Sequence, residues 1–271
     1  MVVQHNLRAM NSNRMLGLTA SSQSKSTEKL SSGYKINRAA DDAAGLAISE
    51  KMRRQIRGLT QATANAQDGI SMVQTAEGAL NEVHDMLQRM NELAVKAATG
   101  TEQSEDRSYI NQEVTALKAE IDRVAATTTF NELNLLNADA TFSLQVGSES
   151  ASVNQIDVTV AAMNTTGLSI NGTTVDTVAN AKTAIDSVKK AITALNKQRS
   201  DLGAQQNRLE HTVNNLNNVV ENTTSAESAI RDTDMATEMV KYANNNILAQ
   251  AGQAMLAQSN QANQGVLSLL Q

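Results

Sequence analysis

The sequence predicts a mostly α-helical protein in which long antiparallel coiled-coil helices carry a small β element. Three observations support this fold class. The chain has 271 residues without a single Pro to break a helix, and only 2% of them are aromatic, which favours thin helix–helix seams over a thick core. Apolar residues recur at alternating steps of three and four over several long stretches. The period changes to two, as in strands, only within residues 130–176.

The first long helix is predicted from a seam that starts at Met52. Its small or apolar positions follow one another in steps of four and three, and they include Thr63, Ile70 and Val73. A further step of three then leads to Ala76, after which the regular seam resumes. We interpret this slip as a stammer, a local overwinding of a coiled coil.

Two more seams predict two more helices, over residues 110–124 and 185–220. The longer one contains two polar members, Arg199 and Gln206, which could fix the helix register at some cost in stability. The middle of the chain is therefore expected to form three antiparallel helices that pack lengthwise.

The β element is expected at about residues 130–176. Apolar residues alternate at two places within it, from Phe142 to Val146 and from Ile156 to Val160. Leu168 and Ile170 then precede Asn171-Gly172, a dipeptide that predicts a hairpin turn.

Both ends of the chain are only sparsely apolar. Each could form a helix, but neither has enough apolar area to stay folded alone. Two interpretations are open: the ends are frayed termini, or they order only when partner chains cover them. The second is favoured, because both ends carry the seam and lack a Gly/Ser linker composition. The expected domains are residues 1–43 plus 231–271, an inner coiled coil formed on assembly, and residues 44–230, an outer helical domain with the β element.

Short polar segments are predicted to join these domains. Gly33 fits the position just after a helix, where a left-handed residue is tolerated. Asp41 and Asp42 fit the N-cap and first turn of the next helix. A similar joint is expected near the other end of the chain, where Asp232 to Asp234 could cap the last helix.

No catalytic site, metal site or cofactor is predicted. The chain has no Cys, its three His (His5, His84 and His211) lack ligand spacing, and no phosphate-binding Gly-rich loop occurs. Adjacent Asp41 and Asp42 would point about 100° apart on a helix, so they do not form a catalytic carboxylate pair. The protein is therefore expected not to be an enzyme.

Other classes of partner are also disfavoured. Without a run of about 18 apolar residues, no membrane insertion is expected, and the N-terminal residues lack the apolar region of a Sec signal peptide. Residues 1–60 carry ten Lys or Arg against four Asp or Glu, which could suggest nucleic acid. These charges lack interleaved aromatics and a recognisable binding module, so we interpret them as solvated or partner-facing.

Several stretches together carry a family resemblance. They include "LSSGYKINRAADDAAGLAISEKM", "GLTQATANAQDGISMVQTAEGALNEV", "LQRMNELAVKAA", "INQEVTALKAEIDRVAATTTFN", "RSDLGAQQNRLEHTVNNL", "RDTDMATEMV" and the ending "ANQGVLSLLQ". With these the sequence resembles bacterial flagellin, in a short form that lacks the large variable outer domains. Two alternatives are the hook–filament junction protein of the same assembly and a secreted helical type III effector or translocator. The latter would need a membrane-active amphipathic segment, and none stands out.

The resemblance implies a structural subunit that polymerises with itself into the helical flagellar filament and serves swimming motility. It implies export of the unfolded chain through the flagellar type III pathway to the outside of the cell. The implied partners are other copies of the chain, an export chaperone, the filament cap protein and the hook-associated junction protein. The expected subunit-interface residues are Leu7, Ala39, Ala40, Ala43, Ala44, Val240, Leu248, Met255 and Leu269.

Recognition by host immune receptors is also implied. By position in the resembled motif, Arg89 and Leu93, with Glu113 on the neighbouring helix, would contact Toll-like receptor 5. The alternative is structural: Leu93 flanks the seam, and Arg89 is a solvated charge near Glu113. The terminal stretch with Val266, Leu267, Leu269 and Leu270 resembles the segment read by cytosolic inflammasome sensors, and it could equally pack in the filament core.

Overall fold

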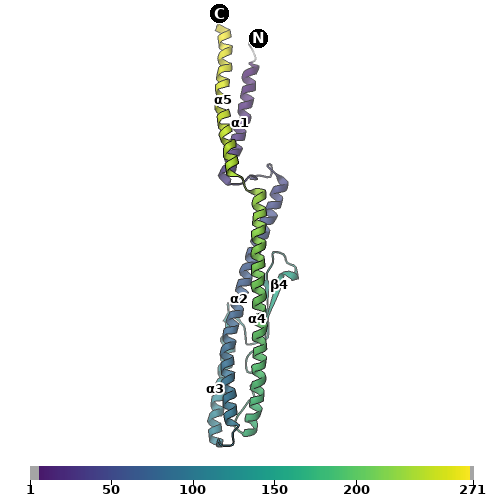
Figure 1. Ribbon diagram of the computed structural model, residues 1–271, viewed down its shortest axis with the longest axis vertical. Coiled ribbons are helices and arrows are strands. Elements are labelled where there is room, and N and C mark those ends of the chain that lie inside the picture. The colour runs from purple at the N-terminus through teal and green to yellow at the C-terminus, as the bar shows by residue number, and fades with distance from the viewer. Residues whose placement is uncertain (1–5, 269–271) are drawn as a thin grey trace. The chain divides into compact units, whose positions relative to one another are not determined.

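Five α-helices account for most of the chain in the computed structural model, which describes residues 6–268 and the side chains up to residue 262 (Figure 1). They are α1 (Leu7–Ser32), α2 (Ala43–Ala97), α3 (Ser104–Thr127), α4 (Val178–Arg231) and α5 (Met235–Ser268). The predicted fold class, mostly α with a small β element, is confirmed. No helix within the described residues has both the length and the apolarity that a bilayer span requires.

The chain forms two compact units. The terminal unit comprises Met1–Arg54 and Asn222–Gln271, and the central unit comprises Gln55–Glu221. The helices α2 and α4 each continue from one unit into the other. The domain limits expected from the sequence, at residues 43/44 and 230/231, concern the assembled protein and stay a prediction.

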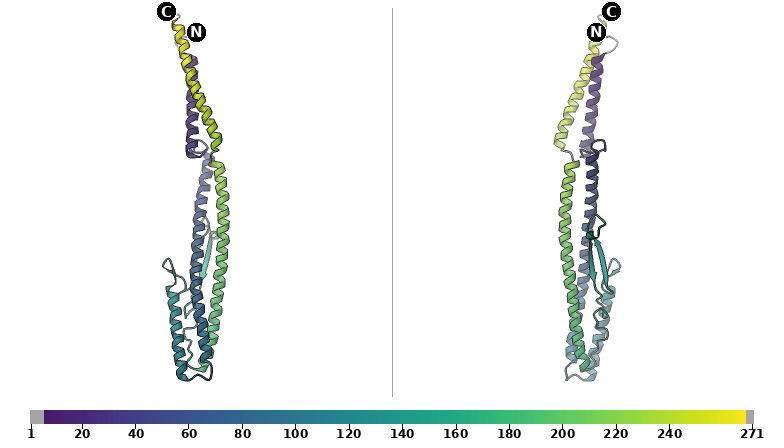
Figure 2. Two further views of the ribbon diagram at one scale, coloured as in Figure 1. Left: turned by 60° about the vertical axis from the view of Figure 1, so that its left-hand side comes forward. Right: turned by 90° about the vertical axis from the view of Figure 1, so that its right-hand side faces the viewer.

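The central unit is a bundle in which α2 runs antiparallel to both α3 and α4 (Figures 1 and 2). Side chains from all three helices form one hydrophobic core. Its largest fully buried members on these helices are Leu80, Leu87, Met90, Ile121, Leu195, Leu202 and Leu209. With so few aromatic residues, aliphatic side chains and alanines fill the seam.

The predicted stammer in α2 is wrong. From Leu59 to Ala97 the buried seam of α2 alternates between steps of three and four without a slip. Ala62 and Gly69 occupy the seam where the sequence suggested Thr63 and Ile70. A Cβ at Gly69 would overlap the side chain of Leu144, and it would lie 3.4 Å from Leu209 Cδ1. Glycine therefore makes room for a strand residue over the helix, which apolarity alone could not reveal.

The buried polar residue on α4 is Gln198, rather than the predicted Arg199 or Gln206, both of which are only half-buried. The side chain of Gln198 donates a hydrogen bond to the carbonyl oxygen of Thr159 (3.1 Å) and accepts one from the amide of Ala161 (3.4 Å). The Gln198 side chain thus supplies the hydrogen bonds that a neighbouring strand would otherwise make with the backbone at Thr159 and Ala161.

The β element is small. Strands β3 (Ala140–Gln145) and β4 (Gln155–Val160) pair antiparallel through six residues each, with Phe142 opposite Val158. The connection between them includes the 3₁₀ turn η1 (Ser152–Asn154). The two-residue strands β1 (Thr129–Phe130) and β2 (Leu133–Asn134) form a second antiparallel pair. The alternating apolar residues of the sequence therefore mark real strands.

The hairpin predicted at Asn171-Gly172 is wrong, since no strand flanks that dipeptide. Leu168 and Ile170 are buried, but in a coiled segment whose backbone bonds are local, such as the one from the Ile170 amide to the Thr165 oxygen (2.9 Å). Asp122 on α3 anchors this segment by accepting hydrogen bonds from the amide and hydroxyl of Thr165 at 2.8 Å. Burial against the helices, rather than strand pairing, determines this conformation.

The role of Gln198 can be tested by Gln198→Leu. We expect the free energy of unfolding of the central unit to fall by about 1–3 kcal/mol, because two backbone groups at Thr159 and Ala161 lose their partner. Urea denaturation followed by circular dichroism measures this. Asn196→Leu, at an exposed position of the same helix, is the control and should change stability by about 0.5 kcal/mol at most. Equal stability of Gln198→Leu and the wild type would show that the bonds are dispensable.

Candidate functional site

The helices α1 and α5 lie side by side and antiparallel within the terminal unit, and their backbones approach closely (Figures 1 and 2). The residues that each helix turns toward the other recur at steps of three and four. We call this contact the terminal seam. It comprises Ala9, Ser12, Leu16, Thr19, Gln23 and Ser26 on α1 with Glu238, Tyr242, Asn245, Ala249, Gly252, Leu256 and Ser259 on α5.

Small and polar residues dominate the terminal seam. They allow the close approach: a Cβ at Gly252 would lie 3.3 Å from Leu16 Cδ1. Each helix contributes a single Leu to the seam, so the contact removes little apolar surface from water. Burial of apolar surface is the main source of stability for a packed helix, so the pairing is weak by itself.

Most large apolar residues of both helices lie outside the terminal seam. We call this set the outer apolar surface, and all its members are exposed. It comprises Leu7, Met10, Met15, Leu18, Met235, Met239, Val240, Ile247, Leu248 and Met255. An extended apolar surface of this kind marks a site of contact with another chain.

Two polar contacts fix the register of the terminal seam. Near one end, the Asn6 side chain donates a hydrogen bond to the Ser259 carbonyl oxygen (3.2 Å). Near the other end, the Ser26 hydroxyl donates to Glu238 Oε1 (2.7 Å), and both residues are buried. Few apolar contacts would oppose a shift of one helix along the other, so these bonds select the alignment.

The carboxylate of Glu238 is charged and almost enclosed, with its side chain 8% exposed. The hydrogen bond from Ser26 holds the pKa of Glu238 below its ordinary value of 4.5, more than burial raises it, and Lys241 adds to the lowering. Because the folded-state pKa is lowered, the stabilisation by Glu238 is present above pH 4.5 and is lost as the pH falls below that value.

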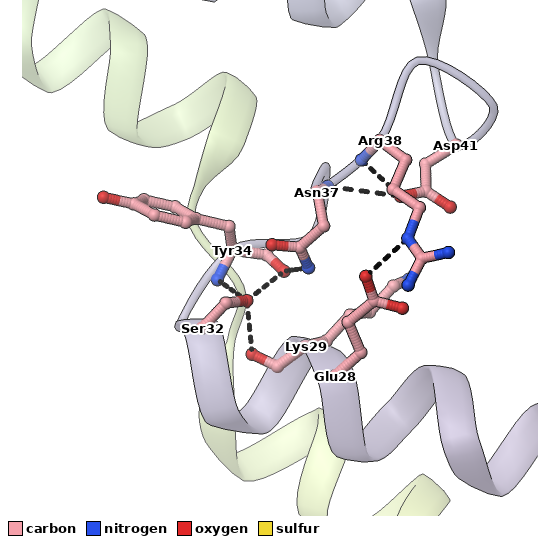
Figure 3. A network of polar contacts seen from close by, with 7 residues as sticks. All are labelled: Glu28, Lys29, Ser32, Tyr34, Asn37, Arg38 and Asp41. Carbon is pink, nitrogen blue, oxygen red and sulfur yellow. Dashed lines mark hydrogen bonds and ion pairs between the residues drawn. The ribbon is translucent and has the colours of Figure 1, made fainter.

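The segment after α1 is a compact polar joint (Figure 3). Gly33 ends α1 in the left-handed conformation (φ 78°), as predicted, and its amide bonds to the Lys29 oxygen. Arg38 Nε donates to Glu28 Oε1 (2.8 Å), and Asp41 Oδ2 accepts from the amides of Asn37 and Arg38. These backbone bonds hold the pKa of Asp41 below its ordinary value.

Capping of the following helices largely matches the prediction. Asp42 Oδ1 accepts from the Gly45 amide (2.9 Å) at the start of α2, so Asp42 caps this helix, whereas Asp41 closes the preceding turn. Asp234 accepts from Ala236 and Thr237 at the start of α5. The hydroxyl of Thr237 and these amides lower the pKa of Asp234. The carboxylates thus determine where both helices begin.

The two predicted joints pair with each other. Tyr34 and Asp232 form an isolated antiparallel bridge, with backbone bonds from the Lys35 amide to the Arg231 oxygen (2.8 Å) and from the Thr233 amide to the Gly33 oxygen (2.9 Å). The Arg231 guanidinium lies 4.7 Å from the centre of the Tyr34 ring.

Arg231 also reaches α2. Its Nη1 bonds to Glu50 Oε1 (2.7 Å), and this bond is the main cause of a lowered Glu50 pKa. Arg231 therefore links the end of α4, the first joint and the start of α2. No sequence pattern had indicated this role, because its partners lie far away along the chain.

The structure exposes every subunit-interface residue predicted from the sequence that it describes. Leu7, Val240, Leu248 and Met255 belong to the outer apolar surface, and Leu269 lies outside the described residues. The four alanines at the joint and the start of α2 are also exposed: Ala39, Ala40, Ala43 and Ala44. Sequence reasoning missed the other six members of the outer apolar surface, because it sought a single stripe. They are Met10, Met15, Leu18, Met235, Met239 and Ile247.

The predicted receptor-contact residues lie together near the far end of α2. Arg89 Nε and Nη2 both lie 2.9 Å from Glu113 Oε1 on α3, and Nη1 lies 3.1 Å from Glu92 Oε2. The Glu113 bond is the main cause of a raised Arg89 pKa. These residues line an open depression of about 450 Å³ together with Lys96 and Tyr109.

Leu93 differs from its two predicted neighbours, because its side chain is 3% exposed and belongs to the hydrophobic core. Arg89 and Glu113 are on the surface and can meet a partner directly, whereas Leu93 supports the helix pair beneath them. The inflammasome-sensor residues Leu269 and Leu270 lie outside the described residues. For Val266 and Leu267 the structure describes only the helical backbone.

These features define a class of protein. Among the described residues no group of three or more His, Cys, Asp or Glu is placed to hold a metal ion. The prominent functional feature is instead the outer apolar surface on a weakly paired helix hairpin. Such a surface is typical of structural subunits that pack against further chains.

Comparison with known proteins identifies the family. Residues 3–141 match the family model described as bacterial flagellin N-terminal helical region, and residues 185–270 match the corresponding C-terminal helical region. The chain is 51% identical to flagellin of Halalkalibacterium halodurans over 271 residues, and 48% identical to flagellin FlaB2 of Treponema pallidum over 287 residues. Both alignments cover the whole of both chains. The chain belongs to the bacterial flagellin family, whose members are structural filament proteins and not enzymes.

Two solved structures align with parts of this chain. The crystal structure of Bacillus cereus flagellin aligns with a TM-score of 0.49 and 32% identity, covering 56% of this chain and 88% of that one. A putative flagellar hook-associated protein from Vibrio parahaemolyticus aligns with a TM-score of 0.59 and 12% identity, covering 71% of this chain and all of the other. The second likeness is one of fold alone.

Ser26→Ala tests the register contact of the terminal seam. The change leaves the enclosed Glu238 carboxylate without its hydroxyl donor, so the polymerised protein should lose about 1–3 kcal/mol of stability per subunit. Thermal dissociation of the polymer, measured by calorimetry at pH 7, would show a lower midpoint.

Ser24→Ala is the matched control, since Ser24 is exposed on the same helix. The difference between the two variants should shrink as the pH falls from 4.5 through the lowered pKa of Glu238, because protonation removes the enclosed charge. Identical midpoints for both variants at pH 7 would contradict the role given to Ser26.

Proposed function

We propose that this flagellin-family subunit polymerises by covering its outer apolar surface with the terminal helices of neighbouring copies. One observation carries the proposal: α1 and α5 turn small and polar residues toward each other and large apolar residues toward water. Within one chain these large apolar side chains stay in water and add no stability by burial. Among many copies, the same outward faces supply the burial that holds a helical polymer together.

Export in an unfolded state is consistent with the same arrangement. A weakly paired terminal hairpin opens at little cost, so the ends of the free subunit can remain unfolded for the type III channel and for an export chaperone. The absence of Cys avoids disulfides that would resist unfolding. Outside the cell the subunit would add to the filament beneath the cap protein, and the first copies would meet the hook-associated junction protein.

The polymerisation proposal is tested by Leu248→Asp. The Leu248 side chain is 57% exposed, so a carboxylate there costs little in the free subunit. In the polymer it would be buried without a partner, and we expect the critical concentration for seeded growth to rise at least about tenfold. Sedimentation of seeded samples measures this.

Gln250→Glu is the control, because it adds the same charge on another side of α5 in a nearly identical shape. Its critical concentration should change much less. If Leu248→Asp polymerised at the wild-type concentration, the Leu248 side of α5 would not be an assembly interface.

Recognition by Toll-like receptor 5 is proposed for the depression on α2 and α3. Arg89 and Glu113 support it, because they form a surface ion pair whose charges can be redirected to a partner. Leu93 would act from below by keeping α2 and α3 packed. The proposal for inflammasome sensors at Val266, Leu267, Leu269 and Leu270 depends on the family resemblance alone.

Arg89→Ala separates a contact role from a folding role. A charged anchor residue at an interface centre contributes about 2 kcal/mol, so monomer binding to the receptor should weaken roughly thirtyfold. The fold should stay intact, because Arg89 is half exposed and its ion pairs lie at the surface. Surface plasmon resonance with the monomer is the measurement.

Arg123→Ala provides the matched control on α3. Arg123 is similarly exposed and pairs only locally with Glu120 among the described ion pairs. Its loss should leave receptor affinity unchanged. Unchanged affinity of Arg89→Ala, with a wild-type circular dichroism spectrum, would rule Arg89 out as a receptor contact.

A further inference from the structure

We propose that the five methionines of the outer apolar surface form an oxidative modification site, at which sulfoxide formation excludes a free subunit from assembly. This inference depends on the proposed polymerisation through that surface. The five residues are Met10, Met15, Met235, Met239 and Met255.

Among the described methionines, those on α1 and α5 differ in exposure from those elsewhere in the chain. Met52, near the start of α2, is half-buried. Every described methionine on the hairpin of α1 and α5 is exposed. In the central unit, Met72, Met90 and Met163 are buried in the core, and Met86 is half-buried against it. A small oxidant in water therefore meets the hairpin sulfurs first.

The composition makes methionine sulfur the main target of a mild oxidant. The chain has 11 Met but neither Cys nor Trp, so no thiol or indole competes for a mild oxidant. Hydrogen peroxide is the oxidant considered. A sulfur lone pair attacks one peroxide oxygen, the O–O bond breaks, and an S–O bond forms. After proton transfer the products are methionine sulfoxide and one molecule of water, so sulfur is oxidised as peroxide is reduced.

The product does not suit the surface on which it forms. Methionine packs into irregular apolar interfaces because its side chain is flexible and its thioether is weakly polar. The sulfoxide is strongly polar and needs a hydrogen-bond donor when buried. In the free subunit water supplies that donor, so the fold is unaffected, but an interface between apolar faces supplies none. The free-energy cost of burying the sulfoxide therefore weakens assembly and not the fold of the subunit.

The first experiment uses the full wild-type chain. Free subunits are treated with hydrogen peroxide until about half carry one sulfoxide, the stage at which single lesions dominate, and are then seeded and sedimented. Mass spectrometry compares the sulfoxide at each methionine in the pellet and the supernatant. We expect sulfoxides at the five outer positions to be enriched about tenfold in the supernatant, and Met72, Met90 and Met163 to stay unoxidised.

Two results would overturn the inference. Equal sulfoxide fractions in pellet and supernatant would show that the modified subunits assemble normally. Preferential oxidation of the central-unit methionines would show that the site is elsewhere. The untreated wild type tests the proposed polymerisation separately. If it did not grow from seeds, the proposed polymerisation would be contradicted, whatever the effect of peroxide.

The second experiment compares variants by the ratio of assembly after and before peroxide, so that each variant is its own reference. Replacing the five outer methionines with Leu should remove the peroxide sensitivity. Met163→Leu, in the central core, should retain the wild-type sensitivity. If the fivefold variant assembled poorly before treatment, the partition of wild-type sulfoxides would still decide the question. If the variant with all five replacements assembled well before treatment but lost assembly after peroxide, the outer methionines would not be the oxidation site.

Discussion

The structure depends on how α1 and α5 meet. Their seam is built from small and polar residues, so the two backbones approach closely but bury little apolar surface. The large apolar side chains, among them Leu18, Ile247 and Leu248, are thereby left facing water. A single chain cannot satisfy this arrangement, because the burial that would stabilise the helices is available only from further chains. The weak pairing within the subunit and the proposed assembly through the outer apolar surface thus have one cause.

The central unit differs from the terminal unit, because it buries its apolar side chains within one chain. Its helices bury an apolar core, and Gly69 gives the β3–β4 hairpin room to lie on α2. Gln198 completes the hydrogen bonds of β4 where no further strand is present. This unit can therefore fold within one chain. The polar joint adds ion pairs and caps around Arg231 and Asp42, which specify the ends of the helices through hydrogen bonds rather than apolar burial.

Much of the fold follows from local sequence patterns. Helical periodicity located the three central helices, alternation located β3 and β4, and Gly33 and Asp234 marked helix ends through backbone chemistry that acts within a few residues. The sequence predictions were wrong where contacts between residues far apart in the sequence determine the conformation. Gly69 lies in the α2 seam because Leu144 packs over it, and the segment at Asn171-Gly172 coils because Ile170 is buried among helices. The pairing of Tyr34 with Asp232 joins residues that no local pattern connects. At the proposed receptor site the burial of Leu93 could be foreseen from the seam beside it, whereas the exposed Arg89–Glu113 pair required the resemblance.

Amide hydrogen exchange of the full chain, free and polymerised, tests the central claim most directly. If α1 and α5 are held mainly by neighbouring copies, their amides should exchange fast in the free subunit and gain protection by orders of magnitude in the polymer. The core amides of α2, α3 and α4 in the central unit should be protected in both states. Strong protection of α1 and α5 in the free subunit, equal to that of the central core, would contradict the account, because it would mean that the terminal seam alone stabilises the hairpin.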